Sequence, residues 1–434
     1  LWGEESNKII KAVEIDCKLR GDYITKRMNN KYVISIPTEN ISCPGSKDNV
    51  NFTDFEDGFE FLRANLSDDT SEYEFLPYFR QAQDISIGMF VNSICMGKAA
   101  VSHDLYIKEI IKEVSSAPIK SREIPNKACN MLSVGDNIKS NKLKIAIANV
   151  DVKGVWNLEN ALKGRKPNRK STRYKALAKL MNEAIVEKAD VLVFPENYIP
   201  FEWLNALASK SAREGLAIIT GVEHIIVKKK NDKEKDRVYN YTAIILPFKY
   251  FDAIPTVAVF FQLKKHYSPE EKRVIEGYGY APVIQDENRP LYRWHDCYFP
   301  VYCCYELTDI HDRSMFMSWA DMVVAVEYNK DTNYFGSIVE SLTRDLHCYC
   351  VQVNTSEYGD SRITQPKKTE EQNMIVVKGG KNASLLIDEI DIQALREFHL
   401  AKYELQKYGA FKPTPPGIDV DIVKQKQNER EDVE

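Results

Sequence analysis

Residues 189–197, with the sequence ADVLVFPEN, decide the fold class of the chain around them. Four successive apolar residues at 191–194, followed by Pro195, are typical of a short strand that is buried on both faces. Glu196 then stands at the carboxyl end of that strand, where α/β sheets gather functional side chains. The alternative interpretation is a glutamate that caps a helix starting nearby.

Strands and helices alternate on both sides of this stretch, through about residues 142–390. Residues 142–152, KLKIAIANVDV, alternate between apolar and other side chains and predict a strand. Residues 171–188 place apolar side chains at helical spacing, and Gly215 ends a second expected helix. This alternation indicates an α/β layered core. Several expected strands follow one another without a helix between them, so we expect mixed sheets.

Composition narrows the class of protein further. The 434 residues are 44% hydrophobic and 28% charged, and the net charge is −4. The charge gives no overall basic field, so nucleic acid is not an expected default partner. The 9 cysteines are spread irregularly without zinc-ligand spacing, which favours a reducing, cytoplasmic compartment. We expect no membrane span, because no apolar run approaches the ~18 residues that one requires.

Changes in pattern divide the chain into four parts. Residues 1–115 are expected to form a mostly helical N-terminal extension, with helical spacing at 73–96 and 104–114. Residues 116–141 are rich in Pro, Ser, Asn and Lys and are interpreted as a linker. Residues 142–396 form the α/β domain. Residues 397–434 are expected to be a C-terminal helix and a tail whose charged end is disordered.

A second motif is FFQLKKHYSPEEK at residues 260–272. An apolar strand delivers Lys264 and Lys265 into a loop that also carries Glu270 and Glu271. A lysine fixed at a strand end can stabilise a developing oxyanion. The same residues also fit a solvated basic pair before a helix that begins at Ser268.

A third motif is PVYCCYELTD at residues 300–309, with two adjacent cysteines after an apolar run. Adjacent residues on a strand point to opposite faces, so Cys303 and Cys304 should have different surroundings. A thiol at a strand end, near a base and a cation, is a candidate nucleophile. Both cysteines could instead be small buried core residues.

The three motifs in this order resemble the nitrilase (carbon–nitrogen hydrolase) superfamily, over about residues 142–396. That family's Glu–Lys–Cys triad matches FPE at Glu196, Lys-x-His at Lys264 and Cys-aromatic-acid at Cys304. Cys303 would then be a buried neighbour that packs on the opposite face. The resemblance implies a four-layer αββα sandwich that pairs into a homodimer or a higher oligomer.

The resemblance also implies a reaction. Cys304 would attack a small-molecule amide or nitrile and form a thioester, with Glu196 as the base. Lys264 and the backbone N–H of Tyr305 would hold the oxyanion. Glu270 or Glu271 would position the lysine or the substrate, and spacing does not decide between them. This chemistry requires no metal and no organic cofactor.

Two alternatives remain open. The domain could be a catalytically silent nitrilase-like module for oligomerisation or partner binding, although the retention of all three triad residue types favours catalysis. The chain could also end a bacterial antiviral reverse-transcriptase–nitrilase fusion, which would add nucleic acid as a partner. The acidic pair Asp68-Asp69 lacks flanking apolar strands and is interpreted as a solvated turn, so we expect no polymerase site in this chain.

Overall fold

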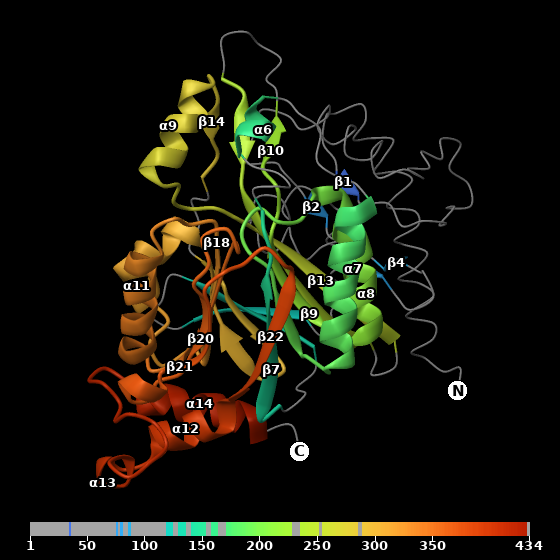
Figure 1. Cartoon of the computed structure of the whole chain (residues 1–434). Helices are drawn as coiled ribbons and strands as arrows, with labels where there is room; N and C mark the ends of the chain where they lie inside the picture. The colour runs from blue at the N-terminus through green and yellow to red at the C-terminus, as the bar shows by residue number, and fades with distance from the viewer. Residues whose placement is uncertain are drawn as a thin grey trace, which may run out of the picture.

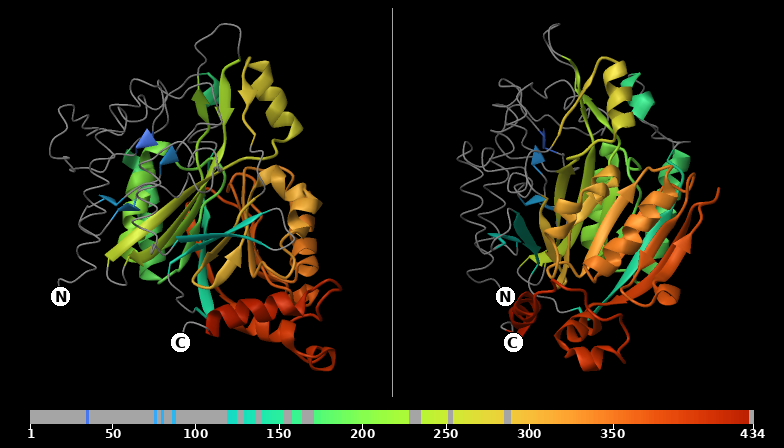
Figure 2. Two further views of the ribbon diagram at one scale, coloured as in Figure 1. Left: turned by 180° about the vertical axis from the view of Figure 1, so that it is seen from behind. Right: turned by 90° about the vertical axis from the view of Figure 1, so that its left-hand side faces the viewer.

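Two β-sheets lie face to face at the centre of the computed structural model, with helices on both outer sides (Figure 1 and Figure 2). The structure describes residues 119–124, 129–135, 140–152, 158–163, 171–227, 235–250, 254–284 and 289–431, together with four two-residue strands before residue 90. Buried side chains from both sheets join one hydrophobic core, including Ile147 and Ile219 of one sheet and Val324 and Val351 of the other.

The first sheet has six strands in the order β13-β12-β9-β8-β7-β22. Its strands are β7 (Lys142–Asn149), β8 (Val191–Val193), β9 (Ala217–Gly221), β12 (Tyr241–Tyr250), β13 (Ile254–Leu263) and β22 (Ser384–Asp391). β7, β8 and β9 are parallel, and β12 is antiparallel to both β9 and β13. Two reversals of direction therefore make β13 run the same way as β8, so their carboxyl ends lie at one edge of the sheet.

The second sheet has five strands in the order β17-β18-β19-β20-β21. Its strands are β17 (Val301–Cys303), β18 (Met322–Glu327), β19 (Tyr349–Asn354), β20 (Ser361–Thr364) and β21 (Asn373–Val377). β17, β18 and β19 are parallel to one another, and β20 is antiparallel to both of its neighbours, β19 and β21. Both sheets are thus mixed, as the sequence predicts.

Helices cover the outer face of each sheet. α7 (Ser171–Val186) and α8 (Leu204–Glu214) contact the six-stranded sheet, and α11 (Thr332–Asp345) contacts the five-stranded sheet (Figure 1). Apolar residues of α11, such as Phe335 and Leu342, belong to one buried cluster with Val323 and Ala325 of β18. The four-layer αββα sandwich expected from the sequence is therefore confirmed. Within the described residues, no helix combines the length and apolar character needed to cross a membrane.

The linker predicted at 116–141 is wrong for two segments. β5 (Ile119–Glu123) and β6 (Asn130–Val134) are strands in a four-stranded sheet with β15 (Leu291–Trp294) and β16 (Cys297–Phe299). Met131 and Leu132 are almost completely buried there. The polar composition of the segment misled the prediction, because β5 and β6 form a hairpin whose other partner, β15, is distant in sequence.

Most of the helical extension predicted at 1–115 lies outside the described residues. The described part consists of β1 (Ile34–Ser35), β2 (Phe75–Leu76), β3 (Phe79–Arg80) and β4 (Ser86–Ile87). β2, β3 and β4 fall within residues 73–96, so the helix expected there is wrong at these positions. Aromatic and β-branched residues such as these favour strands once a pairing partner is present.

The structure contains helix at the C-terminus, as predicted, but the disorder predicted for the charged end of the chain is wrong as far as residue 431. α12 (Ile392–Leu400), α13 (Tyr403–Gln406) and α14 (Val420–Glu431) lie together at one end of the sandwich (Figure 1). Lys426 of α14 is fully buried and donates to Asp321 at 2.9 Å. Arg396 of α12 donates to the same carboxylate at 2.6 Å. The charged end of the chain folds because its lysine is paired with a buried carboxylate.

The substitution Asp321→Asn should destabilise the protein strongly. It removes the charge that pairs with Arg396 and Lys426, and an uncompensated buried charge costs about 3–5 kcal/mol. Urea unfolding followed by circular dichroism measures this loss. The matched control is Glu389→Gln, which breaks an exposed pair with Lys142 and should cost less than about 1 kcal/mol. Equal losses in the two variants would contradict this account of the C-terminal helices.

Candidate active site

Glu196 lies two residues beyond Phe194, at the carboxyl end of β8, and only 3% of its surface is exposed. The chain at Glu196 and Asn197 crosses directly over Gly221 of β9. A Cβ atom at Gly221 would lie 2.4 Å from the Glu196 Cα atom and 2.3 Å from the Asn197 nitrogen. Glycine is therefore required at position 221, because any side chain would push the corner that carries Glu196 off the sheet.

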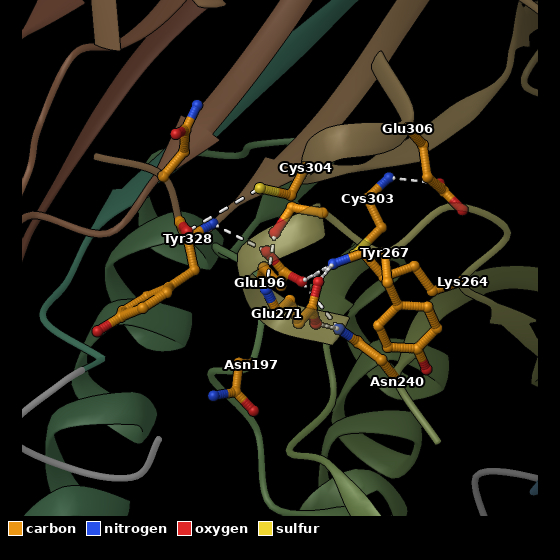
Figure 3. A network of polar contacts seen from close by, with 12 residues as sticks. Glu196, Asn197, Asn240, Lys264, Tyr267, Glu271, Cys303, Cys304, Glu306 and Tyr328 are labelled. Carbon is orange, nitrogen blue, oxygen red and sulfur yellow. Dashed lines mark hydrogen bonds and ion pairs between the residues drawn. The ribbon is translucent and has the colours of Figure 1, made fainter. Parts of the chain in front are cut away.

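Lys264 follows β13 directly, and its side chain is 1% exposed. Its Nζ atom donates to Glu196 Oε1 at 2.8 Å and to Glu271 Oε2 at 2.8 Å (Figure 3). Burial alone would lower the pKa of Lys264, but the charges of Glu196 and Glu271 outweigh burial and hold the pKa well above its usual value. Lys264 is thus a fixed positive charge between two carboxylates.

The structure distinguishes the two glutamates that spacing left open. Both belong to the first turn of α9 (Pro269–Gly277), which Ser268 caps by accepting from the Glu271 N–H. Glu271 points to Lys264, whereas Glu270 is exposed to solvent. Burial alone would raise the pKa of Glu271, but Lys264 and then His224 outweigh it and lower the pKa to about 2.

The two cysteines end β17 at the facing edge of the other sheet. Cys303 is 2% exposed, and its Sγ lies 3.2 Å from Glu196 Oε1. Cys304 is partly exposed, and its Sγ lies 3.9 Å from the carbonyl oxygen of Tyr328 (Figure 3). The prediction that Cys303 packs on the opposite face is therefore wrong. Cys304 adopts a left-handed φ of 50°, which ends the strand alternation on which that prediction depended.

Burial raises the pKa of both thiols well above the usual value, and the charge of Glu196 adds to this effect. Lys264 opposes it in both cases. Each cysteine is consequently a neutral thiol at rest, beside a carboxylate and a fixed cation.

The two oxygens of Glu196 have different surroundings. Oε1 accepts from Lys264, from Asn240 Nδ2 at 2.9 Å and from Cys303. Oε2 accepts from the backbone N–H of Tyr328 at 3.0 Å. Cys304 Sγ lies 3.9 Å from the carbonyl oxygen of the same Tyr328, so this residue contacts both Glu196 Oε2 and Cys304.

Glu306, the acid of the Cys-aromatic-acid motif, connects the two strand ends. It is fully buried, and its carboxylate accepts from the Cys303 N–H at 2.8 Å and from the Lys265 N–H at 2.5 Å. Arg289 pairs with it at 2.9 Å. The carboxylate thereby fixes the backbone beside Cys304 relative to the backbone beside Lys264. Tyr305, whose N–H was predicted to hold the oxyanion, is half-buried in the same turn.

Sequence reasoning missed Asn240, His224 and the peptide of Tyr328. Asn240 follows β11 (Arg237–Tyr239), is fully buried and donates to Glu196. His224 follows β9 and lies 3.4 Å from Glu271 Oε1. The signal that could have found His224 is the pair Glu223-His224 directly after an apolar strand. Among the described residues, no group of three His, Cys, Asp or Glu side chains is placed to hold a metal ion.

The substitution Gly221→Ala should displace Glu196 and weaken the site. We expect a loss of about 1–3 kcal/mol of stability from overpacking, and slower alkylation of the thiols beside Glu196. Thermal unfolding and mass spectrometry of the alkylated protein measure the two effects. Gly277→Ala is the matched control, because a Cβ atom there meets nothing within 4 Å. Unchanged alkylation in Gly221→Ala would contradict the close approach described above.

No family model matches the chain, and no curated protein matches it. Solved structures do match, at low sequence identity. A mutant of the amidase of Nesterenkonia sp. AN1 is 14% identical, with 62% of this chain and 98% of that chain covered and a TM-score of 0.40.

Two further solved structures are similar to this chain, also at low sequence identity. A CN-hydrolase superfamily protein from Xanthomonas campestris, with an arsenic adduct in its active site, is 16% identical over 62% of this chain and 98% of that chain, with a TM-score of 0.41. A branch 10 member of the nitrilase superfamily from Saccharomyces cerevisiae is 14% identical over 61% of this chain and 96% of that chain, with a TM-score of 0.43. The solved structures that this chain resembles are nitrilase-superfamily, or CN-hydrolase, structures.

Proposed function

We propose that this protein hydrolyses non-peptide carbon–nitrogen bonds of small amides or nitriles through a cysteine thioester. The observation that supports the proposal is the position of Lys264, which donates to Glu196 and Glu271 at 2.8 Å each while two thiols lie beside Glu196. A base, a fixed cation and a nucleophile are the three groups that acyl transfer requires.

Cys304 is the proposed nucleophile, and the hydrogen bonds of Glu196 support this choice over Cys303. Oε1 already accepts from three donors, whereas a carboxylate oxygen has two lone pairs. Oε2 accepts from the Tyr328 N–H, which leaves it a second lone pair for a proton. Cys304 is also the more exposed thiol and has the strained backbone that functional residues often adopt. Cys303 instead helps to hold Oε1.

The proposed reaction begins with an amide carbonyl beside Cys304. Glu196 Oε2 takes the thiol proton while sulfur forms a bond to the carbonyl carbon, and the carbonyl electron pair moves to oxygen. Lys264 and the N–H of Tyr305 stabilise that oxyanion. When the oxyanion collapses, the carbon–nitrogen bond breaks, and Glu196 returns its proton to the leaving nitrogen.

The thioester is then hydrolysed by the reverse sequence. Glu196 takes a proton from water, and the resulting hydroxide attacks the thioester carbon. Sulfur leaves as the carbon–sulfur bond breaks, and Glu196 returns the proton to it. A nitrile would first add the thiol to its carbon, with the proton passing from Cys304 through Glu196 to the nitrile nitrogen. The resulting thioimidate would take up one water through Glu196 and release ammonia as its carbon–nitrogen bond breaks, which gives the same thioester.

The first test separates the two cysteines. Wild type, Cys304→Ala and Cys303→Ala are each incubated with 2-chloroacetamide and analysed by peptide mass spectrometry, and each is assayed on a panel of small amides, ureas and nitriles. We expect Cys304→Ala to lose both labelling at the site and turnover, and Cys303→Ala to keep labelling at Cys304. Labelling that persists in Cys304→Ala and disappears in Cys303→Ala would reverse the assignment. A wild-type protein that shows neither turnover nor labelling would favour the silent oligomerisation module.

The second test concerns the oxyanion. Lys264→Met removes the cation from the site, and the loss of one such donor lowers kcat roughly 10²–10³-fold. Lys265→Met is the matched control, because it removes a neighbouring ammonium group and keeps the Lys265 backbone N–H that donates to Glu306. We expect the control to keep kcat within about threefold of wild type. Equal losses in the two variants would argue against a specific role for Lys264.

A further inference from the structure

His224 lies between Glu271 of the site and Asn197 of the corner after β8, and 5% of its surface is exposed. It stands between β9 and β10 (Ile225–Val227). One ring nitrogen, Nδ1, lies 3.1 Å from Asn197 Oδ1, and the other, Nε2, lies 3.4 Å from Glu271 Oε1. The imidazole therefore bridges the corner after β8 and the first turn of α9.

The orientation of the Asn197 amide is fixed by a backbone group. The His224 N–H donates to Asn197 Oδ1 at 3.3 Å, and a backbone N–H can only donate. The amide must therefore present its oxygen and not its NH₂ group to His224. Because Nδ1 faces the same oxygen, Nδ1 must carry a proton to make a favourable contact.

The second ring nitrogen faces an ionised carboxylate. Lys264 and His224 keep Glu271 charged, and a carboxylate oxygen only accepts. Nε2 must therefore also carry a proton. With a proton on Nδ1 alone, the Nε2 lone pair faces Glu271 Oε1. With a proton on Nε2 alone, the Nδ1 lone pair faces Asn197 Oδ1. Each neutral tautomer leaves two acceptors facing each other, and only the imidazolium satisfies both contacts.

The surrounding charges are consistent with an imidazolium at this position. Glu223 precedes His224 and pairs with Arg173 of α7 at 2.7 Å. Lys264 is bound to Glu271 and also to Glu196. Among the described residues, the positive charge of His224 thus lies beside Glu271, which is one of the two carboxylates that bind Lys264.

We propose that protonated His224 is a positioning residue that holds Glu271 against Lys264, so that the site loses activity as rising pH deprotonates His224. This inference rests on the proposed function, since it assigns a further residue to the same site. Loss of the imidazolium breaks one end of this bridge. Without a proton on Nε2, Glu271 Oε1 faces a lone pair and keeps Asn240 Nδ2 as a donor at 3.4 Å. Without a proton on Nδ1, the lone pair faces Asn197 Oδ1, and the ring is no longer held at the corner after β8. Glu271 then shifts, and Lys264 loses its fixed position for the oxyanion.

The kinetic test uses substitutions that keep or remove the donor. Turnover of the best amide is measured from about pH 5 to about pH 9, which brackets the titration of an ordinary histidine. We expect wild-type kcat, more than KM, to fall as the pH rises. His224→Gln keeps an N–H donor that does not titrate, so its kcat should lose this pH dependence. His224→Ala should lower kcat roughly tenfold to a hundredfold at low pH, because a charge-assisted hydrogen bond is gone.

His311→Gln is the matched control, because His311 is exposed on α10 (Ile310–Ser314), and its profile should be that of wild type. Circular dichroism of each variant identifies any that fails to fold. A His224→Gln variant that is folded and keeps the wild-type pH profile would overturn the proposal.

A second measurement does not depend on turnover. ¹⁵N-histidine NMR spectra of the 7 histidines are recorded against pH, and the His224 signals are assigned by their loss in His224→Gln. We expect both ring nitrogens of His224 to be protonated at low pH, and the titration to move to lower pH in Glu271→Gln, which lacks the negative charge. A His224 ring that stays neutral throughout, or a titration that Glu271→Gln does not move, would refute the proposal even in an active enzyme. An intact NMR linkage without amide or nitrile turnover would refute the proposed function alone.

Discussion

A buried ammonium group shared between two carboxylates is the interaction on which the rest of the site depends. Lys264 is 1% exposed, and a lone cation at that depth would be very unfavourable. Glu196 and Glu271 make it favourable, and each of them has further donors to hold it in turn. Removal of any one of these charges would leave another unbalanced in a nearly dry environment. The positions of Lys264, Glu196 and Glu271 therefore depend on one another, and the three side chains act as one structural unit.

The sheets bring this unit together from distant parts of the sequence. β8 and β13 run the same way and end at one edge, and β17 of the facing sheet ends opposite them. Glu306 links the backbones at two of these ends, because its carboxylate accepts from Cys303 and Lys265. The spacing between the proposed nucleophile and the cation is thus set by one carboxylate and not by loop contacts alone.

Local pattern was enough to predict an α/β core and to place Glu196 and Lys264 at the ends of apolar strands that the sequence marks clearly. The four-layer sandwich and the choice of Lys264 over Lys265 came from the family resemblance. Local pattern could not separate Glu270 from Glu271, since the direction of each side chain depends on how α9 begins. It placed Cys303 wrongly, because the left-handed backbone at Cys304 is not signalled by a glycine. His224 acts on a residue 47 positions away, and no local pattern carries that information. The suggested link to a reverse-transcriptase fusion stays a prediction from the sequence.

The buried lysine of α14 has a consequence for how the protein is made. Arg396 is synthesised 75 residues after Asp321, and Lys426 is synthesised 105 residues after it. While the chain is still on the ribosome, β18 begins beside a carboxylate that lacks these cations. The carboxylate at the start of β18 is therefore balanced by residues that are synthesised after the whole five-stranded sheet, whose last strand β21 ends at Val377.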